Sequence, residues 1–275
     1  MRNRFVALLT AALLVSGSAV HAQTQWWPAN GSVILGGGGL AAATFDQAAK
    51  KLISLAGGPD SLIVVIPTAN EGVAPRIRGS GPPVDTNRFK SALEAAGAKH
   101  VAIVHTRNRA VADGEELAKL LHDARGVWIP GGGARILENT YRGTAVAREL
   151  IALLDRGGVI FGDSAGSIAL GCYALGWTPS PWGIVVTGLS VMPHATILPH
   201  ASAARGYAPT DETLKYLVAH PGPTGITIDE NTALVVSFGV AQVIGPGSVS
   251  FIDPAKDSHA PYAVLHEGAA AKLGR

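Results

Sequence analysis

Short apolar runs alternate with amphipathic stretches along much of the chain. Leu62–Ile66 is apolar at every position and mostly β-branched, and Val127–Ile129 and Val159–Phe161 are shorter runs of the same kind. Such runs are typical of strands that are covered on both faces, as in a parallel sheet. In Phe45–Ala56 the apolar residues recur at helical spacing instead, which predicts a helix.

The predicted elements follow one another as strand, helix, strand. Strands are predicted at 32–35, 62–66, 101–104, 127–129 and 159–161, and helices at 45–56, 89–96, 115–123 and 134–156, the last with a break near Gly143. Strands joined by such helices imply right-handed crossovers and a mostly parallel sheet. Beyond residue 171 strands are predicted at 184–191, 195–198, 226–228, 233–237, 241–244 and 248–252, with one helix at 210–219. We therefore predict a single α/β domain with three layers, a mostly parallel sheet and extra C-terminal strands.

The N-terminus has the pattern of a secretory signal peptide. Arg2 and Arg4 precede the apolar run Phe5–Val15, and small residues then lead to Ala22. The run is shorter than the roughly 20 residues that span a membrane, so we predict cleavage after Ala22 rather than a retained anchor. The prediction is a catalytic domain at 23–275 that is secreted or periplasmic and not bound to a membrane.

Charge and cysteine content narrow the classes of function. The chain is 47% hydrophobic and 15% charged, which argues against disorder. Its net charge of +2 comes from 22 basic and 20 acidic residues, and removal of the signal peptide leaves 20 of each. A neutral mature chain gives no support for nucleic-acid binding. Cys172 is the only cysteine, so no internal disulfide can form, and its apolar neighbours predict a buried structural thiol.

A candidate nucleophile lies where a strand runs directly into a helix. The pattern G-x-S-x-G spans Gly162–Gly166, between the run Val159–Phe161 and a helix predicted from Ser164 to Gly171. Small residues allow such a tight turn and lift the serine hydroxyl clear of the sheet. The first N–H groups of the helix also face any oxyanion that forms there. Ser164 is therefore the candidate nucleophile.

Two glycine runs follow other predicted strands. Gly36–Ala41 matches G-x-G-x-x-A, but the acidic residue that a dinucleotide site needs about 20 residues later is not found there, which favours a tight turn without nucleotide. Gly131–Gly133 follows the strand before Ser164. We expect the N–H of Gly132 or Gly133 to form an oxyanion hole with that of Ala165. No cofactor and no metal are predicted.

A nucleophilic serine needs a histidine as base and an acid to orient it. Of the nine histidines, His194, His200 and His220, in the region after the serine, remain as candidates for the base. Asp229–Asn231 directly follows a predicted strand and supplies candidate acids. The pattern alone leaves the choice among these residues open.

Four segments, GVWIPGGG, GGVIFGDSAGS, LPHASAARG and ITIDENTALVV, occur in this order and spacing. They resemble peptidase family S51 and its cyanophycinase-like branch, and the similarity extends over roughly Ser32–Asp253. The resemblance implies a fold like that of the class I glutamine amidotransferases, a flavodoxin-like α/β sandwich, with serine in place of the usual elbow cysteine. It also implies a serine exopeptidase that cleaves small or β-aspartyl-linked peptides through an acyl-enzyme.

The resemblance carries the family's functional residues onto this chain. Ser164 matches the nucleophile, His200 the base and Glu230 the third member of the triad. The oxyanion region matches Gly132, Gly133 and Ala165. The order Ser, His, Glu differs from the order Ser, acid, His of α/β-hydrolases, which weighs against that fold.

The chain also departs from the family at positions that line the substrate pocket. Cyanophycinases usually have Asp-Gln where this chain has Gly133-Ala134, Gln in place of Pro199, Gln-Arg in place of Ala203-Ala204, and often Thr in place of Asp163. These departures leave the substrate open while the triad is kept. A basic substrate end, such as the arginine of β-aspartyl-arginine, would need an acid nearby. The substrate-binding candidates are Asp163, Asn231 and Arg205.

Two alternatives remain at the level of sequence. The replaced pocket residues also suit a non-catalytic binding or processing module on the same fold, and an α/β-hydrolase esterase is a weaker choice. The sequence leaves the oligomeric state open, although homodimers are common in this family.

Overall fold

The computed structural model describes residues 25–70, 86–175, 185–202, 224–253 and 263–273. The predicted signal peptide and the predicted helix 210–219 lie outside these residues, so both stay predictions. No helix in the described ranges is long and apolar enough to cross a membrane.

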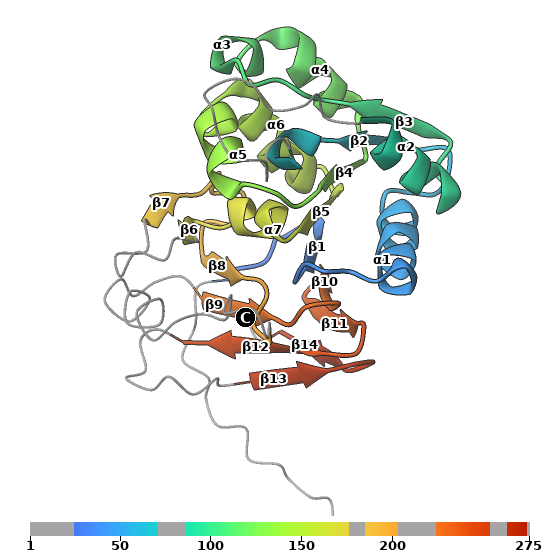
Figure 1. Ribbon diagram of the computed structural model, residues 1–275, viewed down its shortest axis with the longest axis vertical. Helices are drawn as coiled ribbons and strands as arrows, with labels where there is room; N and C mark the ends of the chain where they lie inside the picture. Colours follow the sequence, from blue (N-terminus) through green and yellow to red (C-terminus); the bar gives the residue numbers. More distant parts are fainter. Residues whose placement is uncertain (1–24, 71–85, 176–184, 203–223, 254–262, 274–275) are drawn as a thin grey trace, which may run out of the picture.

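An eight-stranded sheet forms the centre of the structure, in the order β14-β11-β10-β1-β5-β4-β2-β3 (Figure 1). Five neighbouring strands run parallel, namely β1 (Ser32–Gly36), β5 (Val159–Asp163), β4 (Gly126–Ile129), β2 (Leu62–Val65) and β3 (His100–Ile103). Three antiparallel strands extend the sheet beside β1, namely β10 (Ala233–Ser237), β11 (Val240–Ile244) and β14 (Ala270–Lys272). The mostly parallel core of the sheet confirms the predicted fold class.

Helices cover both faces of this sheet (Figure 1). On one side lie α1 (Ala42–Leu55) and α2 (Thr86–Ala95), and on the other α3 (Arg109–Ala112), α4 (Glu115–Asp123), α5 (Ala134–Tyr141) and α6 (Ala145–Asp155). The strand residues divide accordingly, because successive side chains point to opposite faces. Trp128 and Phe161 belong to the hydrophobic cluster with α1 and α2, whereas Val127 and Ile160 belong to the other cluster. The apolar runs of the sequence are therefore strands with a core on each face.

A second sheet contains the C-terminal strands, in the order β13-β12-β9-β8. Its members are β8 (Ala195–Leu198), β9 (Thr224–Ile228), β12 (Ser248–Ile252) and β13 (Ala263–His266), and β8 and β9 run parallel. Ile197, Ile226 and Phe251 belong to the same hydrophobic cluster as Leu35 of the central sheet. The second sheet thus packs beside the carboxyl ends of the central strands, where the candidate site lies.

Several short elements were not predicted from the sequence. They are α3, the 3₁₀ helix η1 (Pro67–Asn70), β6 (Tyr173–Leu175), β13 and β14. The strand predicted at 184–191 is confined to β7 (Val185–Thr187), which pairs with β6. Cys172 is half-buried near this pair, and burial raises the pKa of its thiol above the usual range, as suits a structural residue.

Candidate active site

Ser164 occupies a strained turn between β5 and α7 (Ala165–Leu170), with φ 51° and ψ −113°. The glycines two residues before and after it make the turn possible. A Cβ on Gly162 would lie 2.8 Å from the carbonyl carbon of Gly166, and one on Gly166 would overlap the carbonyl oxygen of Ile129. The pattern G-x-S-x-G is thus explained by backbone contacts, and the turn presents the serine at the carboxyl edge of the sheet.

A chain of two hydrogen bonds connects Ser164, His200 and Glu230. Oγ of Ser164 lies 2.8 Å from Nε2 of His200, and Nδ1 of His200 lies 2.9 Å from Oε1 of Glu230. With the proton on Nδ1, His200 donates to the carboxylate and accepts the serine hydroxyl. His200 comes two residues after β8 and Glu230 two residues after β9. The central sheet therefore carries the candidate nucleophile, and two adjacent parallel strands of the second sheet carry the candidate base and acid.

Three residues of the site have positive φ although none is glycine: Ser164 (51°), His200 (61°) and Asn231 (55°). This conformation costs an L-residue roughly 1–2 kcal/mol. Such strain persists only where surrounding contacts hold the backbone, and it is concentrated at functional sites.

Gly36–Gly39, called here the first glycine turn, forms the wall against which the base and acid pack. A Cβ on Gly38 would overlap the His200 ring, and one on Gly37 would overlap the carbonyl oxygen of Asp229. The N–H of His200 also donates to the carbonyl of Gly37 at 2.9 Å. The sequence predicted a tight turn here but not its contact with the site. The only signal was a glycine run after a strand of the same sheet.

The residues beside Glu230 hold its segment in place. The Asp229 carboxylate accepts hydrogen bonds of 2.8 Å from both the N–H and the hydroxyl of Ser248 in β12. The carboxamide oxygen of Asn231 accepts the N–H of Ala41 at 2.8 Å, just before α1. The N–H of Asn231 also donates to the carbonyl of Gly38 at 2.8 Å, so this predicted substrate-binding candidate ties the Glu230 segment to the first glycine turn.

Gly131–Gly133, called here the second glycine turn, lies beside the nucleophile. The N–H of Gly133 donates to the carbonyl of Ala69 in η1 at 2.8 Å, so it is not available to an oxyanion, contrary to its assignment as a donor. The N–H of Gly132 has no acceptor among the described residues. The N–H of Ala165, at the first position of α7, has no intrahelical acceptor. Gly132 and Ala165 therefore remain as the candidate oxyanion donors.

Asp163 lies between the two glycine turns. Its Oδ1 accepts the N–H of Gly38 at 3.2 Å, and the residue is half-buried. Burial raises the pKa of this carboxyl from 3.8 to about 6, although the Gly38 N–H and the nearby His200 both lower it. A carboxyl that ionises near neutral pH thus adjoins the triad.

Of the remaining sequence candidates the structure describes only His194, which takes no part in these hydrogen bonds. His194 is exposed, and Arg205 and His220 lie outside the described residues. In the ranges that the structure describes, no group of three or more His, Cys, Asp or Glu side chains is arranged to hold a metal ion.

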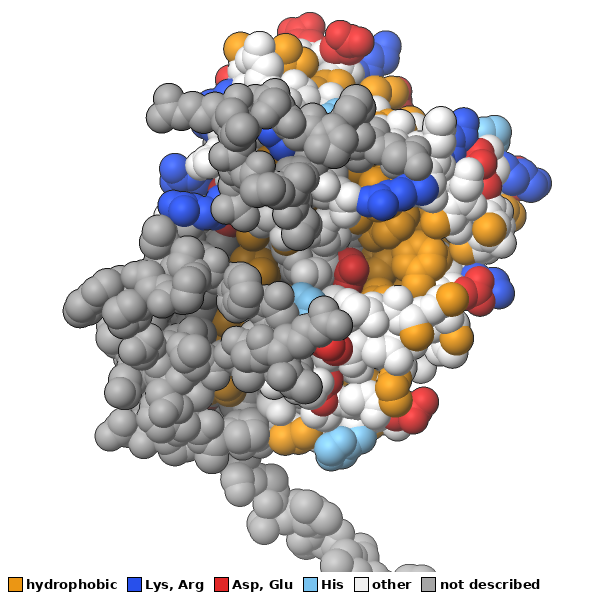
Figure 2. All heavy atoms as spheres, in the orientation of Figure 1, with side chains coloured by type: hydrophobic (Ala, Val, Ile, Leu, Met, Phe, Trp, Pro, Cys, Tyr) orange, Lys and Arg blue, Asp and Glu red, His pale blue; other side chains and the backbone are white. Residues whose placement is uncertain are grey.

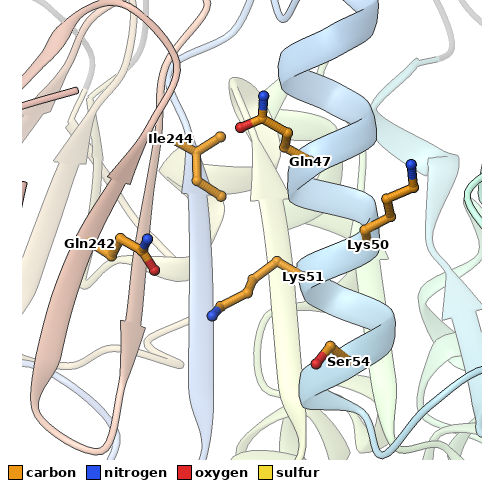
Figure 3. A pocket seen from close by; sticks show the side chains of 6 residues that line it. All are labelled: Gln47, Lys50, Lys51, Ser54, Gln242 and Ile244. Carbon is orange, nitrogen blue, oxygen red and sulfur yellow. The ribbon is translucent and has the colours of Figure 1, made fainter. Parts of the chain in front are cut away.

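The hollows on the described surface include two of about 400 and 270 Å³. The larger, about 400 Å³, lies between α1 and β11 and is lined by Gln47, Lys50, Lys51, Ser54, Gln242 and Ile244 (Figure 3). It contains no residue of the triad and runs toward the C-terminal half of α1, away from the site. The smaller, about 270 Å³, is lined by Phe45, Arg88, Phe89, Ala92 and Trp128.

Comparisons with known proteins agree with this geometry. The sequence model of peptidase family S51 matches residues 33–244. A cyanophycinase from Trichormus variabilis is 30% identical over 213 residues, which cover 74% of this chain and 67% of that protein. A cyanophycinase from Synechococcus elongatus is 29% identical over 216 residues, which cover 76% of this chain and 63% of that protein. The crystal structure of a peptidase from an acI-B1 Actinobacterium has the same fold, with a TM-score of 0.69 at 23% identity over 90% of this chain and 99% of that one.

Proposed function

This chain belongs to peptidase family S51 and is a cyanophycinase-like hydrolase, and from that premise we propose that Ser164, His200 and Glu230 hydrolyse small or β-aspartyl-linked peptides. The observation that carries the proposal is the pair of hydrogen bonds, 2.8 and 2.9 Å, through which one histidine joins the serine to the glutamate. A serine hydroxyl becomes nucleophilic when an oriented base can take its proton.

In the proposed mechanism His200 takes the hydroxyl proton as Ser164 Oγ attacks the substrate carbonyl. The N–H groups of Gly132 and Ala165 then donate to the oxyanion of the tetrahedral intermediate. As the C–N bond breaks, His200 gives its proton to the leaving amine. A water molecule, deprotonated by His200, releases the acyl group. Glu230 stays ionised throughout and stabilises the imidazolium.

The test combines labelling with turnover. We expect a fluorophosphonate to add to Ser164 in the mature protein, detected as a mass shift on the peptide that contains it, and a panel of β-aspartyl and ordinary dipeptides to reveal hydrolysis. Ser164→Ala is expected to abolish labelling and to lower kcat/KM by about 10⁴-fold or more, and Glu230→Gln by about 10²–10⁴-fold. Ser54→Ala, an exposed serine of α1, is the matched control and should change neither.

Labelling also separates this proposal from a binding or processing module, the alternative that the replaced pocket residues suggest. A module without catalysis would bind peptides and leave the probe unreacted, which would overturn the triad.

Export belongs to the proposal as well. The secreted protein should begin at Gln23, as N-terminal sequencing would establish.

A further inference from the structure

An aromatic hollow lies on the face of the central sheet that α1 and α2 cover. Phe45, Arg88, Phe89, Ala92 and Trp128 line its roughly 270 Å³. The Trp128 ring is 4.9 Å from the Phe45 ring and 5.4 Å from the Phe89 ring, centroid to centroid. Figure 2 shows a surface hollow with hydrophobic walls, an acidic side chain at one edge and a Lys or Arg side chain at another. The walls are thus preformed and apolar.

The hollow lies close to the nucleophile. Phe45 and Phe89 are each the fourth residue of their helix, and these helices begin at the carboxyl edge of the sheet. Trp128 is paired in register with Phe161 on β5. Ser164 follows Phe161 by three residues, about 10 Å along an extended chain. A substrate side chain attached next to the scissile bond reaches over much of that distance.

Hydrogen bonds connect the rim of the hollow to the turn beside Ser164. The Arg88 guanidinium donates to the side-chain oxygen of Asn70, and Nδ2 of Asn70 donates to the carbonyl of Gly131 at 3.0 Å. A Cβ on Gly131 would lie 3.0 Å from Cβ of Ser164. The hollow and the nucleophile therefore belong to one connected edge of the molecule.

We propose that this hollow is a specificity subsite that receives a bulky apolar side chain, such as leucine or phenylalanine, of a substrate residue next to the scissile bond. The inference rests on the proposed function and adds the class of substrate. Such walls favour apolar or aromatic groups through burial and ring stacking.

The charge at the rim argues against a basic side chain. The Arg88 guanidinium already lies 4.6 Å from the Phe89 ring centroid, where a substrate cation would stack, and a second cation would meet like charge. Among the described lining residues none is acidic. The subsite therefore favours leucine or phenylalanine over arginine.

Filling the hollow tests this subsite. Ala92 lines it, whereas Ala95 on the same helix is exposed, so Ala92→Phe and Ala95→Phe are a matched pair. Two dipeptide series place Leu, Phe, Ala or Arg either before or after the scissile bond. In one of the two series, kcat/KM should be at least about tenfold higher for Leu or Phe than for Ala or Arg. Ala92→Phe is expected to lower kcat/KM for the Leu and Phe peptides by about tenfold, which brings this ratio close to one. Ala95→Phe should keep the ratio of the wild type. Thermal unfolding by circular dichroism checks that both variants fold.

A binding measurement distinguishes failure of the subsite from failure of the proposed function. Calorimetric titration of the same peptides into Ser164→Ala, with and without Ala92→Phe, measures the affinity for each side chain in the absence of turnover. Turnover without apolar preference would overturn the subsite and leave the peptidase proposal intact. Apolar-selective binding that Ala92→Phe removes, without turnover by the wild type, would support the subsite and overturn the peptidase proposal. Binding without preference would also overturn the subsite.

Discussion

The two glycine turns look alike in the sequence but pack against different parts of the candidate site in the structure. Each follows a strand that flanks β5, the first after β1 and the second after β4, so both lie at the carboxyl edge of the sheet beside Ser164. The first glycine turn packs against His200 and Asp229, and the second packs against η1 and the nucleophile. One supports the base and acid, and the other supports the serine and the oxyanion.

Neighbouring glycines within each turn also differ. A Cβ on Gly38 would overlap the His200 ring, whereas one on Gly39 would lie 3.5 Å from Glu230, an ordinary contact. In the second turn a Cβ on Gly132 would overlap the Ala69 carbonyl, whereas one on Gly133 would meet only the flexible end of Ile136. The glycines of one run are therefore not equivalent. A glycine is required only where the surrounding atoms leave no room for a Cβ.

Among the glycines of the two turns, Gly38 is expected to give the largest effect. In Gly38→Ala the new methyl group displaces the His200 ring and breaks the 2.8 Å hydrogen bond to Ser164. Misplacement by 1 Å costs about 10²-fold and loss of a base far more, so kcat/KM should fall by roughly 10³-fold.

Gly39→Ala is the matched control, since Gly39 also has a positive φ of 60° but has room for a methyl group. It should lower stability by about 1 kcal/mol and change kcat/KM by only a few-fold. Equal losses in both variants would mean that backbone strain, and not contact with His200, gives the first turn its importance.

A smaller effect is expected in the second turn. In Gly132→Ala the methyl group meets the backbone of Ala69, which cannot move cheaply, so the Gly132 N–H is turned away from the oxyanion. Loss of one oxyanion donor lowers kcat by about 10²–10³-fold. Steady-state kinetics should show this loss mainly in kcat.

Gly133→Ala tests the assignment of the donor. Gly133 has an extended backbone, φ −101°, and its N–H is bonded to Ala69. Activity should therefore stay within a few-fold of the wild type. A large loss of activity in Gly133→Ala, with no loss in Gly132→Ala, would show that Gly133 and not Gly132 is the oxyanion donor.

The nucleophile turn and the main sheet could be predicted because their signals are local. Apolar runs identified the parallel strands, and G-x-S-x-G identified the turn, whose glycines the structure explains by close backbone contacts. The sequence left the choice between Gly132 and Gly133 as an oxyanion donor open, because the hydrogen bond of the Gly133 N–H to η1 depends on a distant segment that was not predicted. The strands β13 and β14 were missed because they are only four and three residues long and alternate between half-buried and exposed positions, so neither gives the long apolar run of a fully covered strand.

The base and acid could not be chosen from the pattern of residues. Three histidines after the serine were candidates for the base, and only the family resemblance selected His200 and Glu230. The structure shows the physical basis of that choice: both residues follow adjacent parallel strands, β8 and β9, of a sheet separate from the one that carries Ser164. Pairing between strands so far apart in sequence, and packing of one sheet on another, leave no local signal.

Asp163 lies against both glycine turns. Its Oδ1 accepts the Gly38 N–H, and its carbonyl oxygen lies 3.4 Å from where a Cβ on Gly131 would be. In the folded state burial raises the pKa of the Asp163 carboxyl to about 6 from its ordinary value of 3.8. The folded state therefore holds this proton more tightly than the unfolded state, and stability falls as pH rises from about 4 to about 6.

Asp163→Asn should remove this pH-dependent loss. The amide oxygen can still accept the Gly38 N–H, so the variant is expected to be more stable than the wild type by about 1–3 kcal/mol at pH 8 and to show little gain at pH 4. Urea unfolding at the two pH values measures the difference, with the exposed Asp123→Asn as a control for the charge change. An equal gain at both pH values would mean that ionisation of Asp163 is not its source. Because the acceptor is kept, kcat/KM for neutral peptides should change by less than about tenfold. A much larger loss with the fold intact would show that the carboxylate acts on the substrate or on His200, rather than by holding the first glycine turn in place.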